Sequence, residues 1–460
     1  MLRILAVVVL MISFGARAGT DLPSAPARQV FDRWLAAHNA GERELLAAFN
    51  AAYGVTTDVE DDLEFRESFG RLQLAEVRAE TPTGITVVLV SEWGRALLAT
   101  IGIEQAKVLR LSGMRFEGVP MPEAFRPRPM PMDALVEEAR RRLDALAAED
   151  RLSGSFLLAH AGRPLFAWHG GLADREASVP VSAETRFRFA SLGKMFTAVA
   201  VLQLVEAGRL ELDAPLSTYL PDYPNRAVAD AVTLRHLLSH TGGTGEVFDA
   251  RFSAISSTLR THRDYWPVYA PAPLAFAPGS DDGYSNYGYI LLGSVIEAVS
   301  GQSYYDYVAH HIFDPAGMGA TGAEPESVEV PGRAHAYTRV DGRWVRETAS
   351  LPWRGTAAGG GYTTAGDLMR FAAALADGRL LSEASLRMAT QPQNTKGWYG
   401  FGFLVGGDGA QRQYGHEGGA PGANAVLNVR PATGHVVIGL SNQDPATMEQ
   451  TVNFITQRLP

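Results

Sequence analysis

The chain has 460 residues, of which 46% are hydrophobic and 20% are charged, with a formal net charge of −9 and no cysteine. This length exceeds what one ordinary hydrophobic core organises and indicates two domains or more. The acidic balance without long basic runs argues against a nucleic-acid partner, and the lack of cysteine excludes disulfides and a lipid-modified N-terminal cysteine.

Residues 1–18 have the pattern of a secretory signal. Arg3 precedes an apolar run from Ile4 to Phe14, and Ala16-Arg17-Ala18 is a small-x-small cleavage site. The run is too short to span a bilayer comfortably, and an uncleaved anchor is the alternative. We therefore expect an exported protein, periplasmic or secreted, with no integral membrane segment after cleavage.

Residues 24–120 have the pattern of a small α+β domain. Apolar spacing predicts helices near Val30–His38 and Leu45–Tyr53, then a charged loop at Asp58–Glu64. Four strands are expected next, near Arg71–Glu80, Gly84–Val90, Arg95–Ile103 and Lys107–Phe116. The order weakly resembles the NTF2-like cone domains, and it leaves open a homodimer through this domain.

Residues 121–131 are expected to be a linker, because five prolines between Pro120 and Pro131 disfavour regular structure. Residues 132–460 then form the larger domain. It is expected to start with a charged amphipathic helix, Met132–Ala148, and a hairpin that pairs Ser155–Ala161 with Pro164–His169.

A candidate catalytic pair, Ser191 and Lys194, lies at the start of a predicted helix. Three residues are just under one helical turn, so the Lys194 amine is within reach of the Ser191 hydroxyl. Apolar neighbours lower the pKa of a lysine, and a neutral amine can take the proton of a serine. The chain has three lysines in all and otherwise uses arginine, which cannot act as a base, so the position of Lys194 is informative.

Two histidines four residues apart, His236 and His240, have a spacing that could hold a metal on one helix face. A third ligand with convincing spacing is missing from the sequence. Packing around a helix end is therefore the preferred interpretation, and no metal or other cofactor is expected.

Two further stretches are typical of a polar site. Tyr284-Ser285-Asn286 lies on a turn before an apolar helix, where a phenol beside a lysine could have a lowered pKa and Asn286 offers a donor and an acceptor. His416-Glu417-Gly418-Gly419 precedes two strand-like runs, and its glycines would let the backbone approach a ligand closely.

In this order, Ser191-x-x-Lys194, Tyr284-Ser285-Asn286 and His416-Glu417-Gly418 resemble the three motifs of the serine β-lactamase and penicillin-binding protein superfamily. The similarity is to its class C β-lactamase-related branch, which also holds esterases and D-amino-acid peptidases. It covers Met132–Leu459 and implies a β-lactamase/transpeptidase-like α+β fold, an antiparallel sheet flanked by helices plus a helical subdomain. The small α+β domain would precede this fold.

The resemblance also implies roles for these residues. Ser191 would be the nucleophile that forms an acyl-enzyme, and Lys194 and Tyr284 would share the base work, with the division between them left open. The backbone N–H groups of Ser191 and Gly419 would form the oxyanion hole. Asn286 would bind the substrate amide or the Lys194 amine, and His416 would position Tyr284 or the leaving group.

One departure from the family pattern bears on the substrate. His416-Glu417-Gly418 stands where β-lactamases commonly carry Lys-Thr/Ser-Gly, so the chain lacks a fixed cation there and gains an anion if Glu417 faces the site. We therefore expect a serine hydrolase acting on a small ester or amide without the β-lactam carboxylate. The alternatives are a D-amino-acid peptidase or DD-peptidase acting on short peptides, a weak class C β-lactamase, and a non-catalytic sensor that acylates and stops.

Overall fold

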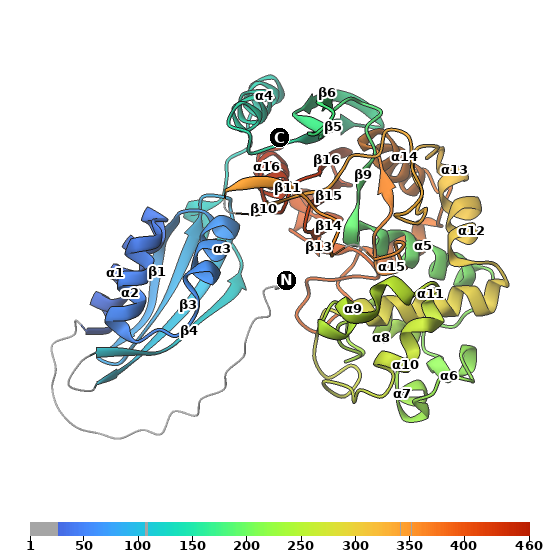
Figure 1. Ribbon diagram of the computed structural model, residues 1–460, viewed down its shortest axis with the longest axis horizontal. Coiled ribbons are helices and arrows are strands. Elements are labelled where there is room, and N and C mark those ends of the chain that lie inside the picture. Colours follow the sequence, from blue (N-terminus) through green and yellow to red (C-terminus); the bar gives the residue numbers. More distant parts are fainter. Residues whose placement is uncertain (1–25, 106–108, 341, 351) are drawn as a thin grey trace. The chain divides into compact units, whose positions relative to one another are not determined.

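The computed structural model describes residues 26–105, 109–340, 342–350 and 352–460 (Figure 1). The expected signal at residues 1–18 lies outside the described residues. The described chain divides into two compact units, one made of residues up to 131 together with 457–460, and the other of residues 132–456. No helix within the described ranges is long and apolar enough to cross a membrane.

The first unit packs three helices on a four-stranded antiparallel meander in the order β1-β2-β3-β4. Its elements are α1 (Pro26–Ala40), α2 (Arg43–Tyr53), α3 (Val59–Phe69), β1 (Leu72–Thr81), β2 (Gly84–Ser91), β3 (Ala96–Gln105) and β4 (Leu109–Val119). The expected loop at Asp58–Glu64 is wrong, because the Asp58 side chain caps α3 by accepting from the amide of Glu60. The linker contains one short 3-10 turn, Glu123–Phe125.

The second unit is built on a six-stranded antiparallel sheet in the order β13-β14-β15-β16-β5-β6. Its strands are β5 (Gly154–His160), β6 (Arg163–Gly170), β13 (Leu404–Gly406), β14 (Gln413–Ala420), β15 (Ala423–Arg430) and β16 (His435–Ser441). The predicted hairpin is confirmed as β5 and β6. Strand β16, near the end of the second unit, therefore pairs with β5, near the start of the same unit.

Helices cover both faces of this sheet. Helices α4 (Met132–Ala148) and α16 (Thr447–Thr456) pack on one face, and α14 (Ala365–Ala376) packs on the other. Alternation along β16 separates the two faces, because Ile438 belongs to the main core while Gly439 faces Met448 of α16. The architecture confirms the expected α+β class.

A helical region lies beside the sheet (Figure 1). Its helices are α5 (Gly193–Glu206), α6 (Leu216–Tyr219), α7 (Arg226–Ala231), α8 (Leu234–Leu238), α9 (Ala250–Ile255), α10 (Trp266–Tyr269), α11 (Asn286–Ser300), α12 (Tyr304–Val308), α13 (Asp314–Ala316) and α15 (Glu383–Ala389). Helix α5 is apolar on all sides, and nearly all of its residues are buried. Its N-terminal end is therefore held rigidly by the main core.

Short strands complete the second unit. They are β7 (Leu172–Asp174), β8 (Val179–Pro180), β9 (Phe187–Arg188), β10 (Tyr337–Val340), β11 (Arg343–Arg346) and β12 (Tyr362–Thr363). The pair that matters for the site is β9 with β12, because it places the chain after Thr356 against the segment that leads into α5.

Candidate active site

Ser191 lies on a 3-10 turn, Ala190–Leu192, that runs directly into α5. Ala190 has φ of 44°, a left-handed conformation that a residue with a Cβ seldom adopts, so the chain turns sharply just before Ser191. Ser191 is half-buried, and Lys194, one helical turn later, is fully buried. Its Nζ lies 3.2 Å from Ser191 Oγ, within hydrogen-bond distance.

The Lys194 amine has two further neighbours. Nζ lies 2.7 Å from Asn286 Oδ1 and 2.6 Å from the carbonyl oxygen of Ala358. Burial lowers the pKa of Lys194 to about 7, and the negative charge of Glu246 opposes this shift in part. At neutral pH a substantial fraction of this amine is therefore uncharged and can accept a proton.

Tyr284 covers the same amine, with Nζ 4.7 Å from the centre of its ring. The residue is 36% exposed, and its phenol lies close enough to Ser191 for that hydroxyl to influence the pKa of the phenol. Desolvation raises the pKa of the phenol above its ordinary value, and the Ser191 hydroxyl offsets only part of that rise. The lowered pKa expected for this tyrosine is wrong, because burial outweighs the attraction of a lysine that is itself only partly charged.

Asn286 opens α11, where Ser285 caps the helix by accepting from the amide of Gly288. Its amide group is oriented by two partners, since Oδ1 faces Lys194 while Nδ2 lies 2.9 and 2.8 Å from the two carboxylate oxygens of Glu246. Both ends of the Asn286 amide are thus engaged by the protein. Asn286 contacts the Lys194 amine, one of its two predicted partners.

Glu246 was not identified from the sequence. It lies in an irregular loop after α8, where its Oε1 also accepts from the amides of Val247 and Phe248. No motif surrounds it, and its approach to Asn286 depends on how the loop folds. The negative charge of Glu246 nevertheless raises the pKa of Lys194 and so opposes the effect of burial.

His416 lies on β14 and is buried. Its Nε2 lies 2.9 Å from the hydroxyl of Tyr399, and its Nδ1 lies 2.6 Å from the carbonyl oxygen of Glu417. Burial, followed by the charge of Lys194, lowers the pKa of His416 to about 3. The ring is therefore neutral across the physiological pH range and gives the site no fixed positive charge.

The two histidines that lie four residues apart, His236 and His240, have separate contacts. His236 closes a capping box on α8, since its Nδ1 accepts from the amide of Thr233. His240 has φ of 60°, and its ring is tilted against that of Tyr284 with the ring centres 4.3 Å apart, while its Nδ1 accepts from the amide of Ser285. The packing interpretation suits His236, whereas His240 belongs to the wall of the site.

Glu417 is the predicted site residue that the structure does not bring to the cluster. Alternation along β14 points its side chain to the face opposite that of His416, where its carboxylate accepts from Asn453 of α16. The expected contact between Glu417 and substrate is therefore corrected. The anion near the site is Glu246.

Glycines let three backbone segments meet at Ser191. A Cβ on Gly418 would collide with the backbone of Phe189 and crowd the amide nitrogen of Ser191, and one on Gly359 would collide with the carbonyl of Ala190. The Gly360 amide donates to that carbonyl across 3.1 Å. The backbone of Gly418 thus lies beside the Ser191 amide, and Gly419, whose amide is predicted to complete the oxyanion hole, is the next residue of β14.

One group of described residues has metal-ligating atoms within 4.8 Å of one another, namely Asp174, Glu176 and His335. His335 Nε2 lies 3.1 Å from Nη2 of Arg346, so it accepts from the guanidinium, and Nδ1 faces Asp174 at 3.5 Å. The adjacent guanidinium disfavours a bound cation. An ion-pair cluster accounts for this group.

Comparison with known proteins agrees with this geometry. Residues 133–459 match the β-lactamase family. The chain is 38% identical over 218 residues to esterase EstB of Burkholderia gladioli, covering 44% of this chain and 53% of that protein. A penicillin-binding protein of Bacillus halodurans superposes with a TM-score of 0.61 at 32% identity, covering 67% of this chain and 97% of the other. The D-amino acid amidase of Ochrobactrum anthropi SV3 superposes with a TM-score of 0.61 at 26% identity, covering 71% and 98%.

Proposed function

The chain belongs to the β-lactamase family and is a serine hydrolase, and we propose that it cleaves a small ester or amide through an acyl-enzyme on Ser191. The observation that carries this proposal is the buried Lys194 amine, with a pKa of about 7, placed 3.2 Å from Ser191 Oγ. A base with such a pKa works near neutral pH.

The reaction would proceed in two balanced halves. The Ser191 hydroxyl proton passes to Lys194 Nζ as Oγ bonds to the substrate carbonyl carbon, and the oxyanion accepts from the amides of Ser191 and Gly419. As the bond from carbon to the leaving group breaks, the Tyr284 phenol gives the leaving group its proton and takes the proton of the Lys194 ammonium, so the amine is neutral again. Water then attacks the acyl carbon as its proton passes to Lys194, and the breaking of the bond between carbon and Oγ returns that proton to Ser191 and releases the acid.

The two pKa shifts support a division of the proton transfers between Lys194 and Tyr284. Lys194 has a lowered pKa and serves as the base, whereas the raised pKa of Tyr284 keeps its phenol protonated. A protonated phenol close to Ser191 is suited to donate a proton to the leaving group. This assigns the base work to Lys194 and the acid work to Tyr284.

The charge of the site favours substrates without a carboxylate near the scissile bond. His416 is neutral where a fixed cation would attract a carboxylate, and Glu246 places a negative charge behind Asn286. These two observations support an uncharged ester or amide over a penicillin or a cephalosporin.

A D-amino-acid amide or a short D-peptide is the second candidate substrate. The structural likeness to D-amino acid amidase supports it, since that likeness spans nearly the whole of the amidase. An amide of this kind carries no carboxylate and therefore meets the same charge requirement.

The proposal is tested by the turnover of four substrates: p-nitrophenyl acetate, p-nitrophenyl butyrate, D-alanyl p-nitroanilide and a chromogenic cephalosporin. Ser191→Ala is the control. Multiple turnovers on the esters that vanish in the variant support the ester hydrolase. Preference for the D-alanyl substrate supports the second candidate, and a single stoichiometric acylation of Ser191 supports a sensor instead.

Export and a homodimer through residues 24–120 are also proposed, on the sequence pattern. N-terminal sequencing of the secreted protein, with a new terminus after Ala18, checks the first. Light scattering of the purified chain checks the second.

A further inference from the structure

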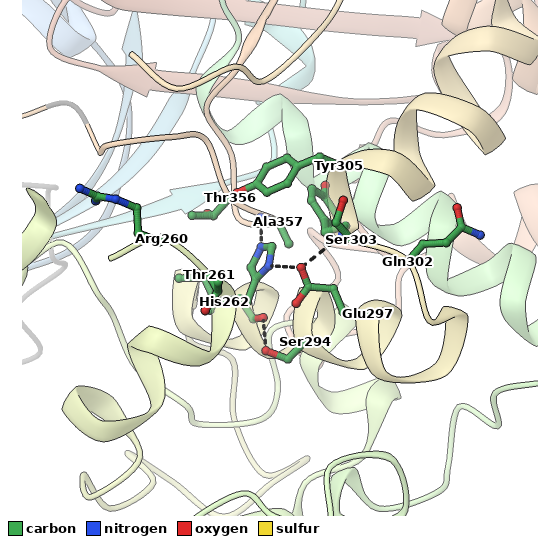
Figure 2. A network of polar contacts seen from close by, with 12 residues as sticks. Arg260, Thr261, His262, Ser294, Glu297, Gln302, Ser303, Tyr305, Thr356 and Ala357 are labelled. Atoms are coloured by element: carbon green, nitrogen blue, oxygen red, sulfur yellow. Dashed lines mark hydrogen bonds and ion pairs between the residues drawn. The ribbon is translucent and has the colours of Figure 1, made fainter. Parts of the chain in front are cut away.

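Figure 2 shows His262, which is buried, between Glu297, which is half-buried, and Ala357. His262 comes from the 3-10 helix His262–Tyr265, and Glu297 comes from α11. His262 Nδ1 lies 3.1 Å from Glu297 Oε1, and the histidine side chain is 1% exposed. Glu297 Oε1 also accepts from the amide of Tyr304 across 3.2 Å.

The other ring nitrogen of His262 determines its tautomer. The amide of Ala357 donates to His262 Nε2 across 3.0 Å, so Nε2 carries the lone pair and Nδ1 carries the hydrogen. Nδ1–H then donates to the carboxylate of Glu297. The pair thus forms a directed chain from Glu297 through His262 to the Ala357 amide.

The peptide that receives this contact is held at each of its polar atoms. The Thr197 hydroxyl donates to the carbonyl of Ala357 across 2.6 Å, and the Ala358 amide donates to Thr356 Oγ1 across 3.2 Å. The carbonyl of Ala358 is the acceptor 2.6 Å from Lys194 Nζ. A movement of the Ala357 amide would therefore move the acceptor of the catalytic amine.

That acceptor matters for the chemistry of the amine. A neutral amine has two hydrogens and one lone pair, whereas an ammonium has three donors. With its hydrogens donated to Asn286 Oδ1 and to the Ala358 carbonyl, Lys194 directs its lone pair to Ser191 Oγ. Loss of one acceptor would let the amine rotate away from the hydroxyl proton.

We propose that His262 and Glu297 are positioning residues, which hold the 357–358 peptide so that the Ala358 carbonyl orients Lys194 toward Ser191. The inference rests on the proposed function. Both acceptors of the Lys194 amine are thereby held by one helix, α11. Asn286 is the first residue of this helix, and Glu297, on the same helix, holds the Ala358 carbonyl through His262. A hydrogen bond between a neutral histidine and a carboxylate contributes modestly to net stability, so a positional role accounts better for the presence of this pair.

The test compares kcat, KM and the pH dependence of kcat/KM for His262→Leu, His262→Gln and Glu297→Gln. Leucine removes the acceptor for the Ala357 amide, while glutamine places an oxygen near the position of Nε2. We expect His262→Leu to lower kcat by about 10- to 100-fold with little change in KM. We expect His262→Gln to recover most of that loss, and Glu297→Gln to lie between them.

A matched control lies on the same helix. Ser294 is buried, and its hydroxyl accepts from Trp266 Nε1, away from the 357–358 peptide. Ser294→Ala should lower the melting temperature while kcat stays within about twofold of the parent, because the partners of its hydroxyl are Trp266 Nε1 and the carbonyl of Ile290 and not the 357–358 peptide. Equal loss of kcat in Ser294→Ala and His262→Leu would overturn the inference, as would a parent-like kcat in His262→Leu.

The pH profile is a second measurement, and a purely structural role of His262 would leave it unchanged. The titratable groups facing Lys194 are Glu246, His240, His416, Tyr284 and Tyr289, and those around His262 are Glu297, Tyr304 and Tyr305. Misorientation of the Lys194 amine in His262→Leu should shift the acid limb of the kcat/KM profile. The limb should stay unchanged in Ser294→Ala. An unshifted limb in His262→Leu contradicts the inference.

Failure of the proposed function gives a different result. In that case the parent does not turn over the esters, or Ser191→Ala turns them over equally well. The labelling of Ser191 by a fluorophosphonate, followed by intact mass, then still reports whether His262→Leu slows activation of the hydroxyl. Slower labelling in this variant supports the positioning role, and parent-like labelling overturns it.

Discussion

A single amide joins Lys194 to Glu246. Asn286 Oδ1 lies 2.7 Å from Lys194 Nζ, and Asn286 Nδ2 lies 2.8 Å from Glu246 Oε2. The asparagine therefore holds the carboxylate near the amine without a direct ion pair. Since Glu246 raises the pKa of Lys194 against the effect of burial, this link tunes the pH at which the amine becomes a base.

The parent enzyme should lose activity below about pH 7. Burial lowers the pKa of Lys194 to about 7, and the ammonium form has no lone pair for the Ser191 proton. Below that pH, kcat/KM on p-nitrophenyl butyrate should fall about tenfold per pH unit. A limb near pH 10, the ordinary range of lysine, would contradict this assignment.

Removal of the Glu246 charge should shift this limb to lower pH. In Glu246→Gln the anion that raises the pKa of Lys194 is gone, so the amine stays neutral to a lower pH, while the glutamine oxygen still accepts from Asn286. Profiles of kcat/KM against pH for the parent and the variant measure the shift. Glu417→Gln is the matched control, since Glu417 points to the opposite face of β14, and its limb should coincide with that of the parent.

Lys194→Arg should abolish catalysis while the positive charge is kept. A guanidinium is always charged and cannot accept the Ser191 proton. We expect kcat to fall by about 10²- to 10⁴-fold, the usual contribution of a general base. Steady-state hydrolysis at pH 8, with circular dichroism to check the fold, measures it. Retention of most activity would show that another group is the base.

Gly359→Ala should disturb the turn that supports Ser191. Gly359 has φ of 145°, and an added Cβ would collide with the carbonyl of Ala190. We expect a loss of about 1–3 kcal/mol in the free energy of unfolding, together with lower kcat. Urea unfolding and ester hydrolysis measure the two effects. Gly319→Ala, where a Cβ would meet open space, should be close to the parent in both.

Much of the fold was accessible from local patterns. Alternation and turn residues predicted β5 and β6, helical spacing predicted α1 and α2, and Ser191 with Lys194 was placed correctly at the start of α5. These features depend on residues that are close together in the sequence. Asp58 shows the limit of prediction from local patterns. It caps α3, so the segment that was predicted to be a loop is a helix.

The amino-acid sequence alone established the order of three motifs, the serine and lysine pair and the loss of a fixed cation at His416. Tertiary structure decided which groups surround that pair. Glu417 turned to the far face of β14 because side chains alternate along a strand, while Glu246 and His240 reached the site from loops. The pKa of Lys194 and the direction of its lone pair depend on burial and on acceptors 92 and 164 residues away in the chain. Contacts of that length arise from packing of the whole domain, which no local pattern encodes.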